Sequence, residues 1–244
     1  MFKYIDKKKE ILDSKRPFNK NSIENLKKYF DVELTYNSNA IEGNTLTITE
    51  TKIILEDGIT IGKGKTLKEH LEVINHKEAI DYIKDIVNKN IDINENVIKD
   101  LHYIILKSIN NENAGRYRSV NVLISGSNHR PPEHFLVSQN MEELIKWYNE
   151  NKDNLHPVRL AAEFHHKFTF IHPFIDGNGR CGRLLMNLIL MRFGYPMTVI
   201  KIQDRSEYMS ALEKASVEND LTDFINIIAE AVSSSLDTYL YILG

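Results

Sequence analysis

The sequence predicts an all-α fold, a helical bundle with one small β-hairpin beside it. Apolar residues recur every three or four positions along most of the 244 residues, which places them on one face of a helix. One stretch, residues 119–137, instead has strand-forming residues next to turn residues. No repeat of fixed period and no low-complexity linker divides the chain, which favours one cooperative unit.

Eight segments have the helical spacing: residues 21–37, 66–88, 94–109, 138–150, 157–170, 180–193, 206–217 and 221–242. Asn178 and Gly179 are start signals for the sixth of these helices, and Gly194 with Pro196 is a stop signal after it. The rest of the chain is expected to connect these helices.

The hairpin is expected in residues 119–137. Residues 119–124, Ser-Val-Asn-Val-Leu-Ile, are typical of a strand, and residues 125–128, Ser-Gly-Ser-Asn, supply a turn. Two prolines follow, and residues 135–137 complete the hairpin as a second short strand.

The composition excludes several classes of protein. A net charge of −3 gives no reason to expect a nucleic-acid partner. The single cysteine, Cys181, excludes an internal disulfide and a cysteine zinc cluster. The N-terminal residues are too charged for a signal peptide, and no apolar run approaches the roughly 18 residues of a membrane span. We therefore expect a cytoplasmic protein with no membrane partner.

Residues 172–183, His-Pro-Phe-Ile-Asp-Gly-Asn-Gly-Arg-Cys-Gly-Arg, hold the richest chemistry of the chain. Pro173 ends the preceding helix, so His172 is expected at a helix-to-loop junction, where a pKa near neutrality suits a general base. Asp176 lies in the following turn, where a carboxylate suits a Mg²⁺ ion beside phosphates. A helix N-cap without metal is the alternative for Asp176.

The turn and the helix after it are suited to bind an anion. Gly177 and Gly179 permit a close approach of the backbone, and the side-chain amide of Asn178 can fix the turn. Arg180 and Arg183 share one face of the first helical turn, where two cations are unfavourable unless an anion joins them. A polyphosphate would supply that anion, and surface arginines paired with local acids are the alternative.

The run from His172 to Arg180, together with Arg183, resembles the signature of the Fic (filamentation induced by cAMP) proteins at every position. The residues leading into the run agree with the family's spacing, as do two short runs, Gly-Arg-Tyr-Arg at 115–118 and Arg-Ser-x-Tyr at 205–208. The resemblance spans roughly residues 95 to 220, with a further piece upstream.

The resemblance implies transfer of AMP from ATP to a Ser, Thr or Tyr hydroxyl of a target protein, with Mg²⁺ or Mn²⁺ as cofactor. His172 would be the base, Asp176 would hold the metal, and Arg183 would reach the γ-phosphate. The turn of residues 177–179 and Arg180 would bind the other phosphates. Lysine in place of Gly179 marks relatives that transfer the γ-phosphate, so Gly179 favours AMP transfer.

The resemblance also assigns the surroundings of the phosphates. Tyr208 and Leu212 fall where the family lines its adenine pocket. The hairpin resembles the family's flap, in which Ile124, Ser125 and Gly126 would hold a segment of the target as an added strand.

Upstream, residues 38–44 read Ser-Asn-Ala-Ile-Glu-Gly-Asn and resemble the family's inhibitory motif. Its key positions are Ser38, Glu42 and Gly43. In the family the glutamate pairs with the second arginine, so Glu42 and Arg183 are the predicted switch, and a bidentate pair would be strong if shielded from solvent. The alternative is that Glu42 only ends a helix that stops at Gly43. With Glu42 as the switch, residues 1–92 would be an N-terminal helical region that carries the inhibitory motif, and residues 93–244 the catalytic core with the C-terminal helices, together one cooperative unit.

Other functions stay open. Glu42 could orient a water for removal of AMP, alone or in addition to transfer. A nucleotide-sensing binding protein without turnover is a third hypothesis, and transfer of phosphocholine or UMP is a fourth. The target protein is not predicted, and a homodimer is a further expectation from the family.

Overall fold

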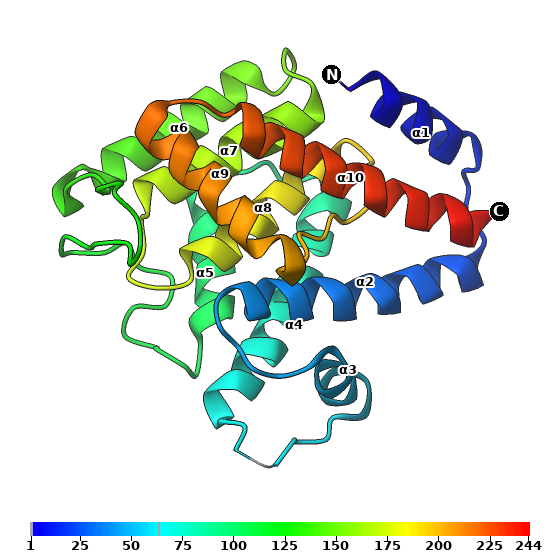
Figure 1. Cartoon of the computed structure of the whole chain (residues 1–244), viewed down its shortest axis with the longest axis horizontal. Coiled ribbons are helices and arrows are strands. Elements are labelled where there is room, and N and C mark those ends of the chain that lie inside the picture. Colours follow the sequence, from blue (N-terminus) through cyan, green and yellow to red (C-terminus); the bar gives the residue numbers. More distant parts are fainter. Residues whose placement is uncertain (1, 63) are drawn as a thin grey trace.

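The protein is all-helical over residues 2–62 and 64–244, the residues that the computed structural model describes. No strand occurs in this part of the chain (Figure 1). The α-helices are α1 (Lys3–Ser14), α2 (Lys20–Ile41), α3 (Ile48–Asp57), α4 (Leu67–Asn88), α5 (Glu95–Leu106), α6 (Val137–Asn151), α7 (Pro157–Ile171), α8 (Asn178–Arg192), α9 (Arg205–Glu218) and α10 (Thr222–Leu243). Two short 3₁₀ helices are η1 (His134–Leu136) and η2 (Ile202–Asp204). The predicted all-α class is confirmed.

Helix α8 lies at the centre of the bundle, against α7, α4 and α5 (Figure 1). Every residue from Arg180 to Leu190 is buried, so the helix is covered on all sides. Burying each large aliphatic side chain contributes about 1.5–3 kcal/mol, so α8 is held firmly by its neighbours. Its N-terminal turn, residues 178–183, is therefore fixed in position and direction.

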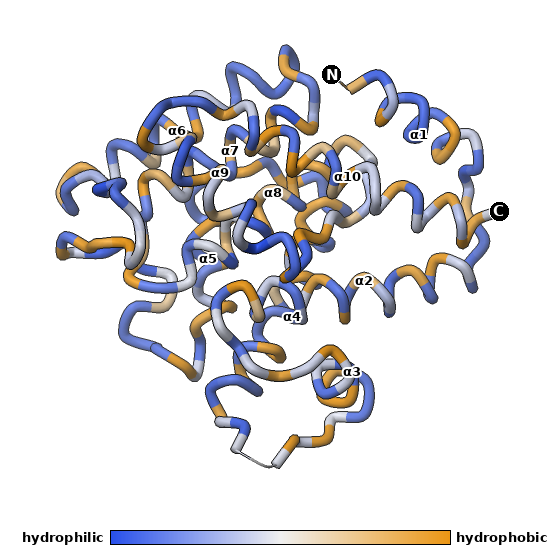
Figure 2. Tube along the Cα trace, in the orientation of Figure 1, coloured by the Kyte–Doolittle hydropathy of each residue, from blue (hydrophilic) through white to orange (hydrophobic). Residues whose placement is uncertain are grey.

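The N-terminal helices share the main hydrophobic core with the rest of the chain. Buried apolar residues from Ile5 in α1 to Leu236 in α10 form one cluster. A smaller cluster of Leu46, Ile54 and Val73 packs α3 against α4. Apolar and hydrophilic residues alternate along α2 in Figure 2, as in a helix with one buried face. The boundary expected between residues 92 and 93 lies in the connection from α4 to α5, and its role as a domain boundary stays a prediction.

The longest helices are α2, α4 and α10, with 22 residues each. Within the described part of the chain, no helix combines the length and the apolar content that crossing a membrane would need.

The eight predicted helices correspond to α2 and α4–α10, and two short helices were missed. Helix α1 buries only Ile5 and Leu12 among many lysines, too sparse a pattern for the spacing rule. Helix α3 begins with a capping box, in which Thr47 and Glu50 bond each other's backbone N–H groups. That box is a readable start signal, and it was overlooked.

The predicted β-hairpin was wrong. Residues 119–133 form an irregular loop, and residues 135–137 belong to η1 and the start of α6. Side chains take the place of a strand ladder: Arg118 binds the carbonyls of Val120 and Pro132, and Glu213 binds Ser127. Only the turn formed as predicted, with Ser127 N donating to Ile124 O at 3.1 Å. We keep the name flap for residues 119–133.

Candidate active site

The loop between α7 and α8, residues 172–177, takes its shape from contacts between neighbouring residues. His172 follows the last residue of α7 in the left-handed conformation, with φ 50° and ψ 59°. Asn178 closes the loop, because its Oδ1 accepts from Phe174 N at 3.0 Å and its Nδ2 donates to Phe174 O at 2.9 Å. Gly177 has a positive φ of 78°, which a side chain would disfavour. The structure thus has the predicted helix-to-loop junction at His172 and the predicted turn held by the Asn178 amide.

His102, on α5, contacts this loop and holds it in place, and the sequence did not predict this role. Its Nδ1 accepts from Gly115 N at 2.9 Å, so its Nε2 carries the proton and donates to Asp176 O at 2.9 Å. The ring stacks on Phe174 with centroids 3.6 Å apart. Burial lowers the pKa of His102 to about 4, so the ring is neutral at physiological pH. The available signal was a histidine on the apolar face of segment 94–109.

His172 has one ring nitrogen free for chemistry. Its Nδ1 lies 3.4 Å from Thr169 O, which can only accept, so Nδ1 carries the proton and Nε2 keeps its lone pair. Burial lowers the pKa of His172 to about 4. The Thr169 carbonyl and Glu42 act in the opposite direction, and Arg118 and His129 lower the pKa further. The near-neutral pKa expected from the sequence is therefore corrected: the imidazole is neutral well below pH 7.

Arg180 is almost fully buried at 3% side-chain exposure, which excludes the surface pairing considered as its alternative. Its Nη1 lies 3.3 Å from Glu72 of α4, and its Nη2 lies 3.6 Å from Asp176. Glu72 in turn accepts a hydrogen bond of 2.8 Å from Asn44, the last residue of the run at 38–44. Glu72 was not predicted, and no motif in the sequence marks it.

Arg183 is buried as deeply and is bound by the N-terminal region. Its Nε donates to Ser38 Oγ at 3.0 Å, and its Nη2 donates to Ser38 O at 2.8 Å and to Glu42 Oε1 at 2.7 Å. The pair with Glu42 is thus made through one carboxylate oxygen, and the bidentate geometry considered from the sequence is wrong. Burial alone would lower the pKa of Arg183, but Glu42 and Tyr208 raise it above its ordinary value.

Carboxylates lie beside both arginines and balance part of what a bound anion would otherwise supply. Glu72 and Asp176 lie beside Arg180, and Glu42 lies beside Arg183. Two donors still lack a partner among the described residues: Arg180 Nε and Arg183 Nη1, both buried. Buried donors without partners are costly, so the site fits an anion at these atoms.

Glu42 follows the last residue of α2, and Gly43 ends that helix with a φ of 96°. Both interpretations of the motif therefore describe the geometry, since Gly43 stops the helix and Glu42 reaches Arg183. Glu42 also lies against Gly179, where an added Cβ would fall 2.2 Å from Glu42 Oε1. Gly179 is helical and has no positive φ, so the carboxylate and not the backbone requires glycine there.

A cavity of about 710 Å³ brings most of the predicted residues together. The loop of residues 172–177, called the catalytic loop from here on, contributes His172 to the lining, and α8 contributes Gly179 and Arg183. Glu42 lines the cavity next to Arg183. The remaining walls include the predicted adenine residues Tyr208 and Leu212 and the predicted flap residues Ile124, Ser125 and Gly126. The lining does not include Asp176, Gly177, Asn178, Arg180, Ser38 or Gly43.

Tyr208 is almost completely buried at the back of this cavity, which limits what it can offer a ligand. Its hydroxyl bonds His165 Nε2 at 2.9 Å, and its ring lies 6.0 Å from the Arg183 guanidinium. Tyr208 thus packs behind Arg183, and Leu212 is the more exposed member of the predicted pair.

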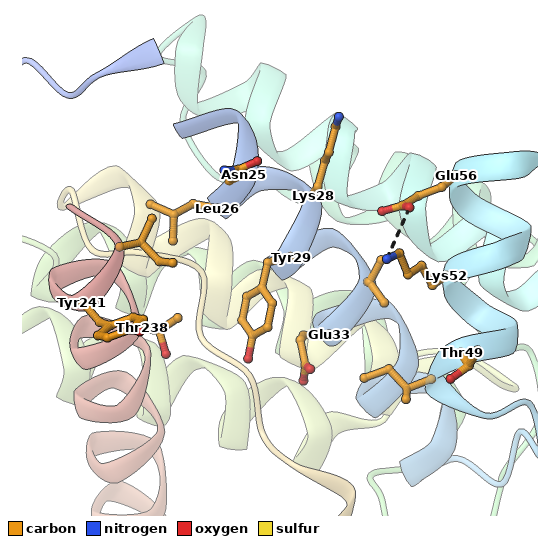
Figure 3. A pocket seen from close by; sticks show the side chains of 13 residues that line it. Asn25, Leu26, Lys28, Tyr29, Glu33, Thr49, Lys52, Glu56, Thr238 and Tyr241 are labelled. Atoms are coloured by element: carbon orange, nitrogen blue, oxygen red, sulfur yellow. Dashed lines mark ion pairs between the residues drawn. The ribbon is translucent and has the colours of Figure 1, made fainter. Parts of the chain in front are cut away.

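A larger cavity of about 900 Å³ lies between α2, α3 and the end of α10 (Figure 3). Its lining includes Leu26, Tyr29 and Tyr241, and the ion pair of Lys52 and Glu56 lies at its edge (Figure 3). None of the predicted site residues lines it. Size alone would favour this cavity, but the smaller one is lined by His172 and by Arg183, whose Nη1 lacks a partner among the described residues, so we take the smaller one as the candidate site.

Asp176 is the candidate metal ligand, and its surroundings fit a weakly held cation. Its side chain is half exposed, and its Oδ1 accepts from Gly177 N at 2.6 Å. The described residues contain no group of three or more His, Cys, Asp or Glu side chains that could hold a metal. A Mg²⁺ ion bound by one carboxylate usually takes its other ligands from phosphates and water, which is the arrangement that this loop permits.

Comparisons of sequence agree with the geometry. The model of the Fic/DOC family matches residues 92–190. A protein adenylyltransferase Fic from Nematostella vectensis is 39% identical over 207 residues, which are 84% of this chain and 48% of that protein. The protein of that name from Drosophila melanogaster is 37% identical over 243 residues, 97% of this chain and 49% of its own length. This chain therefore spans about half the length of the curated relatives that it matches.

Solved structures extend the similarity to almost the whole chain. A Fic domain containing signaling protein from Bacteroides thetaiotaomicron superposes with a TM-score of 0.92 at 33% identity, over 98% of this chain and 96% of that one. A fragment of Fic-1 from C. elegans superposes with a TM-score of 0.88 at 30% identity, over 98% of this chain and 71% of that one. The similarity thus includes α1–α4, outside the residues that the family model matches.

Proposed function

The chain belongs to the Fic/DOC family, and from that premise we propose that it is a self-inhibited protein adenylyltransferase. It would transfer AMP from ATP to a Ser, Thr or Tyr hydroxyl of a target protein and of itself. One observation carries the proposal: a single cavity is lined by a neutral histidine, by an arginine with a buried unpartnered donor, and by the glutamate that occupies that arginine. Relatives 37–39% identical are named protein adenylyltransferases, which supports it.

His172 would start the reaction. Its Nε2 takes the proton of the target hydroxyl, and the oxygen attacks the α-phosphorus of ATP. The bond from the α-phosphorus to the oxygen bridging to the β-phosphorus breaks, and pyrophosphate leaves with the negative charge. The products are an AMP ester of the target and pyrophosphate, with the proton on His172. Because the imidazole pKa is lowered to about 4, this proton is readily passed on to solvent.

The phosphates would lie at the N-terminus of α8. The free N–H groups of residues 178–180 and the helix dipole favour negative charge there. Arg180 and Arg183 would add charge-assisted hydrogen bonds, and Arg183 would meet the γ-phosphate with its unpartnered Nη1. Asp176 would hold Mg²⁺ or Mn²⁺, which when bound neutralises charge on the α- and β-phosphates. Positioning and charge neutralisation carry most of the catalysis in such transfers.

Glu42 would prevent this reaction. It occupies Nη2 of Arg183 at 2.7 Å and places a negative charge where the γ-phosphate would lie. The Ser38 contacts hold Arg183 in the same orientation. ATP would then bind poorly or in a pose that His172 cannot use, until residues 38–43 move.

The test replaces Glu42 by glycine and supplies Mg²⁺ and ATP labelled on the α-phosphate. We expect label on the protein itself in Glu42→Gly, little in the unmodified chain, and none in Glu42→Gly with His172→Ala. Glu24→Gly, a change to a glutamate within α2 that does not line the cavity, controls for disturbance of the helix. If Glu42→Gly transfers no more label than the unmodified chain, the inhibitory role of Glu42 is refuted. If no variant transfers label, the transferase proposal fails and a nucleotide-sensing protein becomes the better hypothesis.

Removal of AMP is a second candidate, favoured by one observation. Glu42 keeps a third of its side chain exposed and shares the cavity lining with His172, so it could hold a water near an AMP ester. A target carrying AMP, released by the unmodified chain and not by Glu42→Gly, would support this activity. Labelled UTP and CDP-choline in the same assay would test transfer of UMP and phosphocholine.

A further inference from the structure

Arg118 is a buried cation that the proposed reaction does not use. Only 4% of its surface is exposed, and no carboxylate among the described residues forms an ion pair with it. All of its side-chain hydrogen bonds go to backbone carbonyls. Burying a guanidinium without a carboxylate partner costs free energy. That cost suggests that the contacts of Arg118 fix a geometry on which function depends.

One set of contacts surrounds the base. The Nε of Arg118 donates to His172 O at 2.9 Å, and its backbone N donates to Pro173 O at 2.9 Å. Its Nη2 lies 3.5 Å from Ile171 O, at the end of α7. Arg118 therefore binds the carbonyls before, at and after the catalytic histidine.

These contacts matter because His172 has an unfavourable backbone conformation. A residue other than glycine with φ 50° persists only where its surroundings hold it. The last carbonyls of α7 also lack helical partners and carry the negative end of the helix dipole. The Arg118 guanidinium holds the backbone of His172 in this conformation and also donates hydrogen bonds to the carbonyls at the end of α7.

The other set of contacts holds the two ends of the flap. Nη1 donates to Val120 O at 3.0 Å, and Nη2 donates to Pro132 O. One planar group thus joins the entrance of the flap, its exit and the backbone of the base.

We propose that Arg118 is a positioning residue that holds His172 and the flap in one frame, so that a hydroxyl presented by the flap meets the base. For the reaction this inference rests on the proposed function, whereas the positions of His172 and the flap can be measured without it. A lysine cannot replace Arg118, because an ammonium lacks the planar fork that reaches several carbonyls.

The charge of Arg118 adds a second, separable effect. Burial lowers the pKa of His172 most, and Arg118 and His129 lower it further, while the Thr169 carbonyl and Glu42 raise it. Removing the charge at 118 should therefore raise the pKa of His172, whereas lysine should leave it low.

The experiment uses two variants in the Glu42→Gly background, Arg118→Lys and Arg118→Gln. Arg116→Lys and Arg116→Gln are matched controls, since Arg116 is exposed and lies only two residues before Arg118. Self-transfer of label, ATP affinity by calorimetry and the His172 pKa by NMR are measured on each. We expect both Arg118 variants to lose about tenfold or more in transfer, since small misplacements of reacting groups are costly. ATP affinity should stay within about twofold of the parent, because Arg118 makes no contact with the phosphate-binding residues.

The His172 pKa should rise in Arg118→Gln alone, and flap amides should exchange faster with solvent in both variants. Transfer by Arg118→Lys equal to that of Arg116→Lys would overturn the proposal. A loss of ATP affinity as large as the loss of transfer would also overturn it, because Arg118 would then support the whole site and not the base alone. Failure of Arg118→Lys to fold would overturn it too, because Arg118 would then be a residue of general stability. If the Glu42→Gly parent transfers nothing, the proposed function fails, and the pKa and the flap exchange still decide the role of Arg118.

Discussion

The catalytic loop and the flap are both irregular segments near the same cavity, yet they differ in how much local contact holds them. Within the catalytic loop, Asn178 binds Phe174, four residues away, through both ends of its amide. The far end of the flap is held by Glu213 of α9, which accepts from Asn128 N at 2.7 Å across 85 residues. The loop therefore has a short-range contact of its own in addition to its contacts with His102 and Arg118. The flap is held mainly by Arg118 and Glu213, which lie outside it.

This difference suits the two proposed tasks. Transfer needs fixed positions for the base and the phosphates, and a loop built from short contacts to a buried helix gives them. Recognition of a target segment needs free backbone groups, and residues 120–126 are paired neither in a strand nor in a helix. A segment added beside them could use those groups.

The largest effect is expected from removing the Asn178 amide, which tests the difference between the loop and the flap. In Asn178→Ala, the buried N and O of Phe174 lose their partners, which costs about 1–3 kcal/mol for each unsatisfied group. We expect transfer in the Glu42→Gly background to fall by about 100-fold or more, since the loop loses its geometry. Labelled ATP and urea unfolding measure the two effects. Asn121→Ala is the matched control: it removes an exposed hydrogen bond of 2.8 Å, donated by His134 N of η1 to Asn121 Oδ1 of the flap, and should change stability by less than about 1 kcal/mol. Equal effects of the two changes would show that loop and flap are held alike.

A second prediction concerns the place where the inhibitory segment meets the loop. In Gly179→Ala the new Cβ would fall 2.2 Å from Glu42 Oε1, so the carboxylate must leave its position at Arg183. We expect transfer by the otherwise unmodified chain to rise about tenfold, which corresponds to about 1.4 kcal/mol. Stability should not fall by more than the lost ion pair, since alanine is about 0.5–1 kcal/mol better than glycine within a helix.

Gly179→Ala combined with Glu42→Gly is the control for this prediction. The double variant should be no more active than Glu42→Gly, because both changes remove the same contact. Additive increases would show that Gly179 acts through the phosphates and not through Glu42.

The same contrast explains how far the sequence could be interpreted. The helix start at Asn178 and the junction at His172 depend on neighbouring residues, and both were predicted correctly. The flap was predicted as a hairpin because residues 119–124 favour a strand locally. Its actual path depends on Arg118 and Glu213, whose contacts no local pattern reveals. His102 and Glu72 were missed for the same reason, since each acts on a loop that is distant in sequence.

A smaller effect is expected from Glu213→Gln. The change keeps the size of the side chain and weakens its hydrogen bonds to Ser127 and Asn128, which loosens the flap without touching the loop. We expect a few-fold rise in the KM for a protein target and little change in kcat, as for a loss of uniform binding. Until a target is known, faster amide exchange confined to residues 124–130 is the measurement. Glu207→Gln, on the same helix and away from the flap, is the control, and equal exchange in both variants would contradict the role of Glu213.

The smallest expected effect is that of pH on the transfer rate, and the catalytic loop and the flap should respond to pH differently. Burial lowers the pKa of His172 to about 4, and loss of Glu42 would lower it further, so the base is neutral throughout the ordinary range. Transfer by Glu42→Gly should then change by less than about twofold between pH 8 and pH 5 as far as the base decides it, and should fall only as pH approaches 4. The order of the flap depends on pH through Glu213, whose pKa is lowered by the hydrogen bond from Ser127. Its contribution to the order of the flap is present above the unfolded pKa of glutamate and is lost as pH falls through the lowered value. A transfer rate that falls with a midpoint near pH 6.5 would contradict the buried, neutral histidine, and would place His172 in a solvated position like that of the flap.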